Sequence, residues 1–427
     1  MKKLLAVIML LSCAVSLWSQ EIAEPKKQPK KRNPDRPLRY VEFGLDMDAG
    51  LANNVFGFGD IFNAERTLTV DFKKLASSIN DINADIAGKI DVFFNVNFGE
   101  EFGIGFHGGV DVLIYGDISE EILEFLADGN KGNIEGALAA GGSIFWDNGI
   151  NMYTKFEKLK VRLSPSLFVP LVYMPKPTAK ISIHTENPLS VNLELDARIY
   201  TPLSIVAENL MELSGNDTTA SRQVNSNELS DAYGFDMSVD AEYELFPFLD
   251  VGGSISHIPL YPARLSHSIK TTYSYSSGDF NDILDDLIKN DFELPDSGEV
   301  KMERKDNESF KVYRPLRFNI FADYKPQSIQ SNLLGLTVRP NLGLSFLTVY
   351  DTVCFNAGLE AQLRFMRLLY LKLGMAYHER IWRNYLNFAL NLRVIELDLG
   401  VGIQSQNFLK SFQLNGLNAV AGFRMGF

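Results

Sequence analysis

The chain has 427 residues, a formal net charge of −12 and 46% hydrophobic residues, with 30 Phe and 16 Tyr among them. This acidic balance argues against general nucleic-acid binding, so we expect no nucleic-acid partner. Beyond the first 20 residues Cys354 is the single cysteine, and the five His are dispersed without metal-ligand spacing. We therefore expect no disulfide, no metal site and no cofactor.

The N-terminus has the pattern of an export signal. Met1-Lys2-Lys3 precede the apolar run Leu4–Leu11, and small residues follow up to Ser19. This predicts a signal peptide over residues 1–19, cleaved after Ser19. The apolar stretch, about 15 residues at most, is shorter than the ~20 that a spanning helix needs, which disfavours a membrane anchor. The run ending at Cys13 also resembles a lipobox, whose alternative is cleavage and acylation at Cys13.

Residues 20–39 differ from the rest of the chain in composition. Positions 26–39 contain seven basic residues, one acidic residue and three Pro. Such a segment cannot form a core, and we interpret residues 20–39 as a basic, Pro-rich, solvated linker. Attraction to anionic lipid headgroups is the alternative.

The strongest pattern is period-two alternation over segments of about ten residues, as in Phe355–Phe365, whose odd positions are apolar and even positions mostly polar. The same pattern occurs at residues 191–199, 235–245, 336–346, 369–377, 386–394 and 395–403. A soluble antiparallel sheet also alternates, but its strands have a mode of about 5 to 6 residues. Charge is confined to one parity, as expected if a Lys or Arg facing lipid costs roughly 2–4 kcal/mol. The pattern therefore predicts transmembrane β-strands.

The chain ends and connections agree with a barrel. Residues 417–427 alternate up to the terminal Phe427, an ending typical of bacterial outer-membrane barrels. Short reversals at Pro247-Phe248, Arg367-Leu368 and 393–395 contrast with longer connections at residues 203–231, 276–312 and 405–415. Because an open sheet edge cannot stand in lipid, we expect a closed, all-β, antiparallel barrel in the cell outer membrane.

We expect about 14 strands in a barrel over residues 99–427, starting near Phe102, with residues 40–98 as a partly helical hatch in its lumen. Val41–Asp48 and Lys89–Phe98 are possible further strands, which would make 16, since even counts are the rule. Helical periodicity is present at residues 70–79, 118–127, 203–213 and 280–288.

The sequence contains no motif of a nucleophile, a metalloprotease or a phosphate-binding loop, so we expect no enzymatic activity and no catalytic residue. Gly103–Gly108 matches a dinucleotide-binding motif in its letters, but it lies within an alternating strand, and we interpret it as barrel wall. Inward positions are acidic on early and middle strands and basic on late ones. These are Glu194, Asp196, Asp240, Glu242 and Glu244, against Arg317, Arg339, Arg364, Lys372, Arg393 and Arg424. They indicate opposite walls of opposite sign, serving either a structural network around a plug or a selective passage.

The chain resembles the FadL-like (long-chain fatty-acid transporter type) outer-membrane barrels, most closely those of spirochaetes. The residues that prompt this are Phe43–Asn54, Phe58–Phe62, Ile258–Leu265 and Phe427. The resemblance implies a 14-stranded barrel with an N-terminal hatch, and hydrophobic ligands that enter from outside and leave sideways through the wall. The Asn-Pro-Ala motif usual in that hatch is absent, and Leu51-Ala52-Asn53-Asn54 stands in its place.

A hydrophobic ligand needs an apolar pocket with a few polar anchors. Phe93, Phe168 and Phe321 interrupt polar inward rows and are candidate lining residues, and Arg317 or Arg339 are candidate partners of a fatty carboxylate.

The sequence thus favours uptake of long-chain fatty acids or other hydrophobic solutes. Expected partners are outer-membrane lipid, a hydrophobic small-molecule ligand and the barrel-assembly machinery. The alternatives are a scaffold barrel for a secretion or surface complex and an open polar porin. A soluble periplasmic β protein is the least favoured alternative.

Overall fold

The computed structural model describes residues 39–55, 82–99, 101–122, 124, 134–176, 178–184, 190–212, 226–277, 299–349 and 352–427. The predicted signal peptide, the acylation alternative at Cys13 and the basic linker up to residue 38 lie outside these residues. The predicted helices at 70–79 and 280–288 lie outside them as well. Within the described ranges, no helix has the length and apolar character needed to span a membrane.

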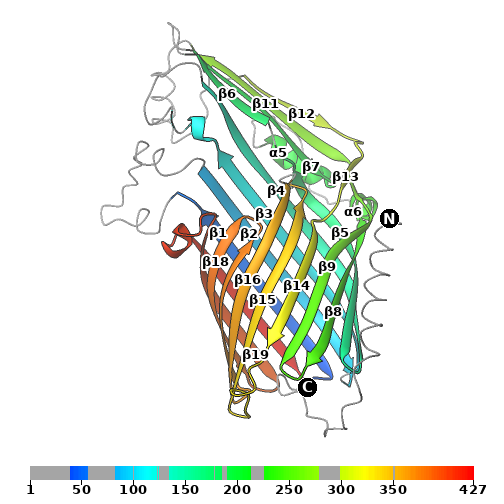
Figure 1. Cartoon of the computed structure of the whole chain (residues 1–427). Coiled ribbons are helices and arrows are strands. Elements are labelled where there is room, and N and C mark those ends of the chain that lie inside the picture. Colours follow the sequence, from blue (N-terminus) through cyan, green and yellow to red (C-terminus); the bar gives the residue numbers. More distant parts are fainter. Residues whose placement is uncertain are drawn as a thin grey trace, which may run out of the picture. The chain divides into compact units, whose positions relative to one another are not determined.

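Fourteen antiparallel strands form a closed ring (Figure 1). In ring order they are β1 (Val41–Asn53), β2 (Ile82–Phe98), β3 (Phe102–Ile118), β4 (Ile134–Phe156), β5 (Leu159–Met174), β8 (Gly234–Phe246), β9 (Leu249–Tyr261), β14 (Leu316–Tyr324), β15 (Leu334–Leu347), β16 (Thr352–Phe365), β17 (Leu369–His378), β18 (Ile381–Asn391), β19 (Ile395–Ser405) and β20 (Gly416–Gly426). The ring closes where β1 pairs with β20, with Gly44 opposite Arg424. The predicted fold class and the count of 14 are confirmed.

The predicted hatch is wrong at both of its ends, because β1 and β2 belong to the wall. β1 pairs with β20 on one side and β2 on the other, and β2 continues the ladder to β3. The barrel therefore begins at Val41, and the two strands considered as extras are among the 14. The middle of the predicted hatch, residues 56–81, lies outside the described residues.

A sheet extends beyond the ring on one side (Figure 1). β4 is 23 residues long, and its first residues, Ile134–Leu138, pair with β6 (Thr178–His184) instead of β5. The sheet continues through β7 (Ser190–Thr201), β11 (His267–Ser277) and β12 (Glu299–Lys305). The strand predicted at residues 191–199 is therefore real but stands in this extension, which removes Glu194 and Asp196 from the barrel wall.

Short turns join the strands at one end of the barrel, where the C-terminus also lies (Figure 1). Several of these turns contain non-glycine residues with left-handed backbone, including Glu157, Arg367 and Arg393. The longer connections lie at the other end. They carry α5 (Ser204–Glu212), α6 (Ser226–Asp231), the paired strands β10 (Ala263–Leu265) and β13 (Phe310–Val312), and η1 (Lys410–Phe412). The predicted asymmetry of connections is confirmed, and α5 confirms the helix expected at 203–213.

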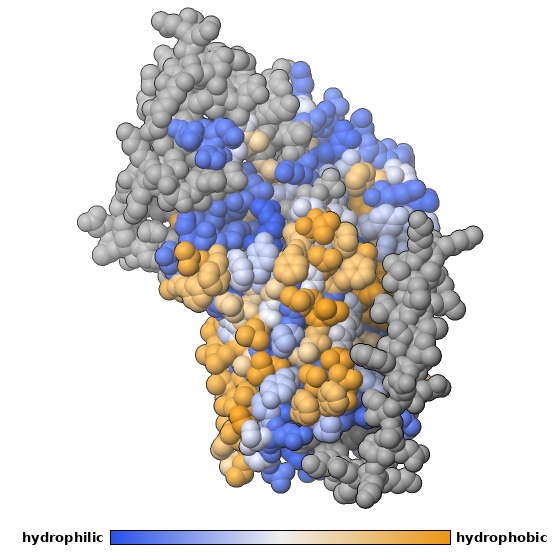
Figure 2. Space-filling model, in the orientation of Figure 1, coloured by the Kyte–Doolittle hydropathy of each residue, from blue (hydrophilic) through white to orange (hydrophobic). Residues whose placement is uncertain are grey.

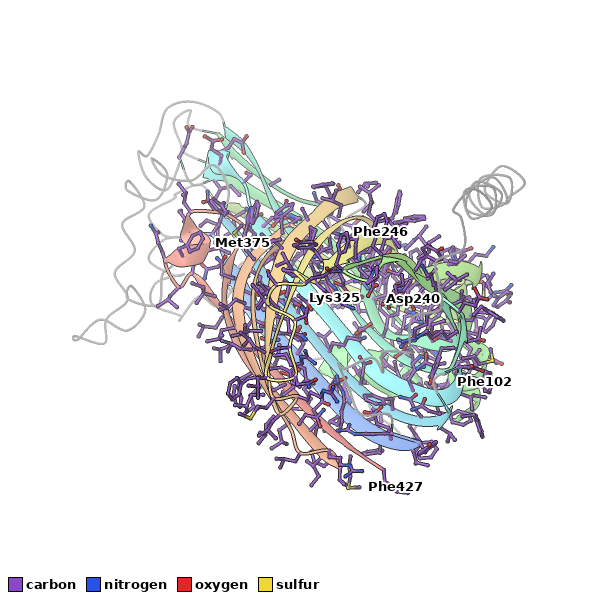
Figure 3. The ribbon with its side chains drawn as sticks, turned by 60° about the horizontal axis from the view of Figure 1, so that its bottom comes forward. Phe102, Asp240, Phe246, Lys325, Met375 and Phe427 are labelled. Atoms are coloured by element: carbon purple, nitrogen blue, oxygen red, sulfur yellow. The ribbon has the colours of Figure 1, made fainter. Side chains whose placement is uncertain are left out.

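Side chains alternate between an apolar exterior and a polar interior. On β16, Phe355 and Leu359 are exposed on the outside, whereas Asn356 between them is buried and donates to Ser345 Oγ. Apolar side chains cover the outside of the strands, and the end with the extension is hydrophilic (Figure 2). Seen from the short-turn end, Met375 and Phe102 lie outside the ring, and Asp240 and Lys325 point toward its interior (Figure 3). This is the inverse of a water-soluble sheet, whose apolar face is covered by the protein itself.

Candidate functional site

An apolar cluster crosses the lumen at the long-connection end. The strand pair β10–β13 and the residues after β15 fold inward and pack against side chains of β3, β4 and β5. Its buried members, which we call the mouth cluster, are Tyr115, Phe145, Phe168, Tyr173, Tyr200, Ala263, Leu265, Val312, Leu347, Val349 and Cys354. Phe145 and Phe168 meet edge to face with centroids 6.0 Å apart. The lumen is thus narrowed here by connections from later in the chain, a role the sequence assigned to an N-terminal hatch.

Two tyrosines tie the mouth cluster across the ring. Tyr115 Oη on β3 donates to Val349 O at 3.2 Å, and Tyr173 Oη on β5 donates to Thr348 O at 3.1 Å. In ring order, β3 and β15 are separated by five strands on one side and seven on the other. The Tyr115 bond therefore reaches from one wall toward the opposite one, whereas β5 and β15 are separated by three strands on the shorter side.

Arg314 fastens the inward-folded segment to the wall. It lies between β13 and β14, and its guanidinium donates to both oxygens of Asp236 at 2.7 Å and to Asp147 Oδ2 at 2.6 Å. The side chain is 3% exposed and lies over the ring of Phe168, 5.3 Å from its centroid. Burial alone would lower the pKa of Arg314, but its bonds to Asp236 and Asp147 raise it above its ordinary value. A doubly paired buried cation of this kind is costly to break.

A cavity of about 290 Å³ adjoins this cluster inside the lumen. More than half of its lining residues are charged or titratable, and its apolar lining comes from Ala87, Val112, Leu113, Phe145 and Pro315. The charged and titratable lining residues are Asp48, Lys89, Asp111, His257, Arg314, Arg317, His378, Glu379 and Arg383. The volume is near the lower end of the ~300–1,000 Å³ usual for small-molecule sites.

Arg317 is fixed within this cavity by Glu379, from the β17–β18 turn. Its Nε and Nη2 donate to the two carboxylate oxygens at 2.6 and 3.2 Å. Burial alone would raise the pKa of Glu379, but Arg317, with a further contribution from His378, lowers it to about 2. The neighbouring Arg380 reaches across to Asn83 and Asp117 at 2.9 and 3.4 Å. Arg380 therefore holds this turn to β2 and β3 across the ring, and Glu379 holds it to β14.

His257 is a cavity residue that sequence reasoning missed. It has φ +59° at a bulge where the β8–β9 register shifts, and its Nδ1 lies 2.9 Å from Pro315 O. A left-handed histidine in a strand is uncommon, and bulges often lie beside functional sites. A signal was present in the sequence, because the apolar parity of β9 changes between Ile255 and Ile258.

The five predicted site residues do not form one site, and among them Arg317 alone lines the cavity. Phe168 is 1% exposed and is packed within the mouth cluster, where it contributes to the narrowing of the lumen. Phe93 lies near Arg424, with the guanidinium 5.9 Å from its ring centroid. Phe321 supports Arg339 at 4.7 Å, and Arg339 is engaged by both oxygens of Asp323 at 2.6 Å.

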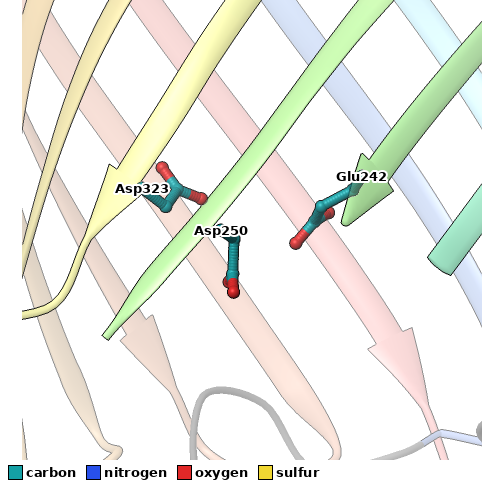
Figure 4. A group of neighbouring side chains, drawn as sticks. All are labelled: Glu242, Asp250 and Asp323. Carbon is teal, nitrogen blue, oxygen red and sulfur yellow. The ribbon is translucent and has the colours of Figure 1, made fainter. Parts of the chain in front are cut away.

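Three carboxylates, Glu242, Asp250 and Asp323, have oxygens within 4.8 Å of one another on β8, β9 and β14 (Figure 4). Lys325 pairs with Asp250 at 2.6 Å, and Arg339 pairs with Asp323. The group is compensated by two cations, and we interpret it as an ion-pair network of the wall. Arg424 similarly pairs with Asp46 at 3.2 Å. The predicted separation of charge onto opposite walls is therefore wrong, because cations face anions on neighbouring strands.

Ser166, His107 and Asp147 have the residue types of a hydrolytic triad but not its geometry. His107 Nε2 lies 3.1 Å from Ser166 Oγ, and the same nitrogen lies 3.9 Å from Asp147 Oδ2. A triad needs the carboxylate on Nδ1, opposite the nucleophile. Here Asp147 is instead occupied by Arg314.

The wall ladder is interrupted between β4 and β5 close to His107. Pairing runs to Gly149 opposite Ser166 and resumes at Met152 opposite Leu163. Pro165 lies in this interval and has no N–H with which to complete the ladder. The interruption is one of several in the wall, because the β8–β9 register also shifts and the β14–β15 pairing skips from Phe321 to Tyr324.

Comparison with known proteins gives structural likeness only. No family model and no curated protein sequence matches the chain. Its structure is similar to a TodX deltaS2S3 mutant monoaromatic hydrocarbon channel (12% identity, 92% of this chain and 91% of that one, TM-score 0.47). It is also similar to the Ralstonia pickettii toluene transporter TbuX (8%, 92% and 90%, 0.46) and the P. putida toluene transporter TodX (10%, 92% and 91%, 0.43).

The class of this protein follows from its own strands. A closed antiparallel ring with an apolar exterior and charged interior is the form in which β-strands satisfy their backbone in lipid. The protein is an outer-membrane β-barrel. Its 14-stranded architecture is the one implied by the FadL-like resemblance, and the spirochaete detail stays a prediction.

Proposed function

We propose that this barrel takes up small hydrophobic or amphipathic solutes across the outer membrane. The observation that carries the proposal is the cavity beside the mouth cluster, which joins the apolar Leu113 and Phe145 to the charged Arg317 and Lys89. The apolar side chains give such a solute a contact surface, and the many charged groups around them favour a solute that carries a polar group of its own.

The size of the cavity bears on the solute. At about 290 Å³ it suits a single ring or a short chain. A long-chain fatty acid, the solute favoured from the sequence, would have to extend into the mouth cluster while its carboxylate lies near Arg317. We therefore propose compact hydrophobic solutes first and fatty acids second.

The β4–β5 interruption is the proposed way out. A hydrophobic solute gains little by crossing the charged lower lumen, where Arg339, Asp323 and Lys325 lie, and gains by passing sideways into lipid. Gly149 borders the interruption, and the two strands approach each other closely there, since a Cβ at Gly149 would overlap the ring of His107 and lie 2.6 Å from Pro165 O.

The two alternatives make different demands on the structure. An open polar porin needs an unobstructed aqueous lumen, which the mouth cluster disfavours. A scaffold barrel needs no cavity, so filling the cavity would leave its activity intact. A stable partner that co-purifies with the barrel would favour the scaffold.

The test is uptake into proteoliposomes, with a radiolabelled monoaromatic hydrocarbon and a long-chain fatty acid as separate probes. Leu113→Trp fills the cavity, and Ile114→Trp places the same side chain on the lipid-facing side of the next residue. We expect uptake of at least one probe to fall about tenfold in the first variant and to stay unchanged in the second. Equal uptake in both variants, or none by the folded wild-type barrel, contradicts the proposal.

A further inference from the structure

The β19–β20 connection lies on the outside of the barrel. Phe408 meets the ring of Trp382 with centroids 4.8 Å apart, and Asn384 Nδ2 donates to Ser411 Oγ at 2.9 Å. Trp382 and Asn384 lie four and two residues before the exposed Leu386 on β18, so all three side chains point outward. The connection therefore overhangs the lipid-facing wall.

Beneath this overhang the wall is hollowed. A groove of about 700 Å³ runs across β16, β17, β18 and β19, with an almost entirely apolar lining. Two rows of outward side chains form it in register: Leu359, Met375, Asn384 and Ile403 in one, and Ala361, Leu373, Leu386 and Val401 in the other. Ala361 contributes a single methyl group where its neighbours contribute larger side chains. Leu414, from the overhanging connection, and Leu417, on β20, add to the lining.

We propose that this groove holds an acyl chain of a membrane lipid. The occupant follows from continuity, because the groove lies within the exposed apolar surface that the barrel presents to lipid. Leu373, Leu386 and Val401 are 54%, 43% and 64% exposed, so a chain lying along them covers a large apolar area. The overhang covers the groove at the long-connection end, which in outer-membrane barrels faces outward, so the lipid belongs to the outer leaflet.

One polar residue, Asn384, indicates which way the lipid would lie in the groove. Asn384 is the amide in an otherwise apolar row, and it lies at the end of the groove nearest the overhang through its bond to Ser411. A carboxamide has two N–H donors and a carbonyl. One donor is used by Ser411, and the other can meet an ester oxygen of the lipid while the acyl chain runs toward Ala361.

This site is separate from the luminal cavity, since the two share no lining residue and lie on opposite faces of the wall. The inference therefore stands or falls independently of the proposed uptake. A second copy of the barrel is the other occupant that an apolar wall could take, and the test below distinguishes it.

The test is native mass spectrometry of the full barrel after reconstitution with phosphatidylethanolamine and phosphatidylglycerol and re-extraction in mild detergent. We expect one lipid to remain on the wild-type monomer. Ala361→Trp fills the groove and should lower lipid retention about tenfold, and Ala241→Trp, on the lipid-facing row of β8, should leave it unchanged.

A second variant protects the test against misfolding. Leu414 has φ +56°, a conformation that Asn tolerates, so Leu414→Asn removes the apolar cap without strain in the backbone. It should also lower lipid retention while the barrel stays folded, as judged by heat-modifiable migration. Loss of all lipid from the wild type, unchanged retention in the folded variants, or a lipid-free dimer overturns the proposal.

Discussion

Tyr115 on β3 and Val349 after β15 are joined across the lumen by a single hydrogen bond of 3.2 Å from the phenol to the carbonyl. Tyr173 makes the parallel bond to Thr348 from the same wall. These bonds hold the inward-folded connection against β3 and β5, so the conductance of the barrel should depend on them.

Removing both hydroxyls should make the mouth open more often. A net hydrogen bond contributes about 1 kcal/mol, so Tyr115→Phe with Tyr173→Phe should raise the open fraction roughly 5- to 30-fold. Single-channel recording in planar bilayers measures this. Tyr377→Phe is the control, because that ring lies against Trp382 on the outer wall. Equal open times in the double variant and the control would show that the bonds do not hold the mouth.

Arg314→Met should unfasten the segment between β13 and β14. It leaves the buried Asp236 and the partly buried Asp147 without their cation, which costs about 3–5 kcal/mol. We expect a lower urea midpoint in detergent and a larger conductance. Arg264→Met is the matched control, since Arg264 is exposed and lies over Tyr261. A midpoint equal to that of the control would contradict the structural role of Arg314.

Stability should fall in acid through Glu379. Its pKa is lowered from 4.5 to about 2, so its ion pair with Arg317 stabilises the fold fully above pH 4.5. That contribution, about 3 kcal/mol, is lost as the pH falls from 4.5 toward 2. Urea unfolding across this range measures it, and Glu379→Gln should show a shallower dependence. An identical slope in wild type and variant would contradict the assignment.

Gly234→Ala should disturb the mouth cluster from the wall side. A Cβ at Gly234 would overlap the ring of Phe168 and lie 2.7 Å from the backbone nitrogen of Ala263. Overpacking of this kind costs about 1–3 kcal/mol. Gly88→Ala is the control, because its nearest atoms lie at 3.8 and 3.9 Å. Thermal unfolding in detergent compares the two variants. Equal melting temperatures would show that Phe168 can shift to make room for the added Cβ at little cost, which would contradict the prediction.

The wall of the barrel could be predicted from the sequence because its cause is local. Each lipid-facing position must be apolar, and successive side chains alternate between the two faces. The direction of each side chain can therefore be predicted from the sequence in the strand that contains Phe355 and in the one that ends at Phe427. The same reasoning placed β1 and β2 in a hatch. Their alternation was visible, but pairing with β20 is not a local property.

The site depends on contacts between distant segments. Arg317 was found because it is a basic residue on an inward row, but nothing near it in sequence indicates Glu379 as its partner. Phe168 and Phe93 read alike in sequence, yet one is packed in the mouth cluster and the other lies near Arg424. His257 was missed because a bulge changes which way a side chain points without changing the composition around it.

The alternation of apolar and charged residues was enough to predict a barrel with an apolar outside and a charged inside, since the bilayer imposes that order on every strand. Which residues cross the lumen depends on contacts that form after the barrel closes. Ring closure brings β3 opposite β15, and which connection then folds inward depends on packing among residues more than 200 positions apart, such as Tyr115 and Val349.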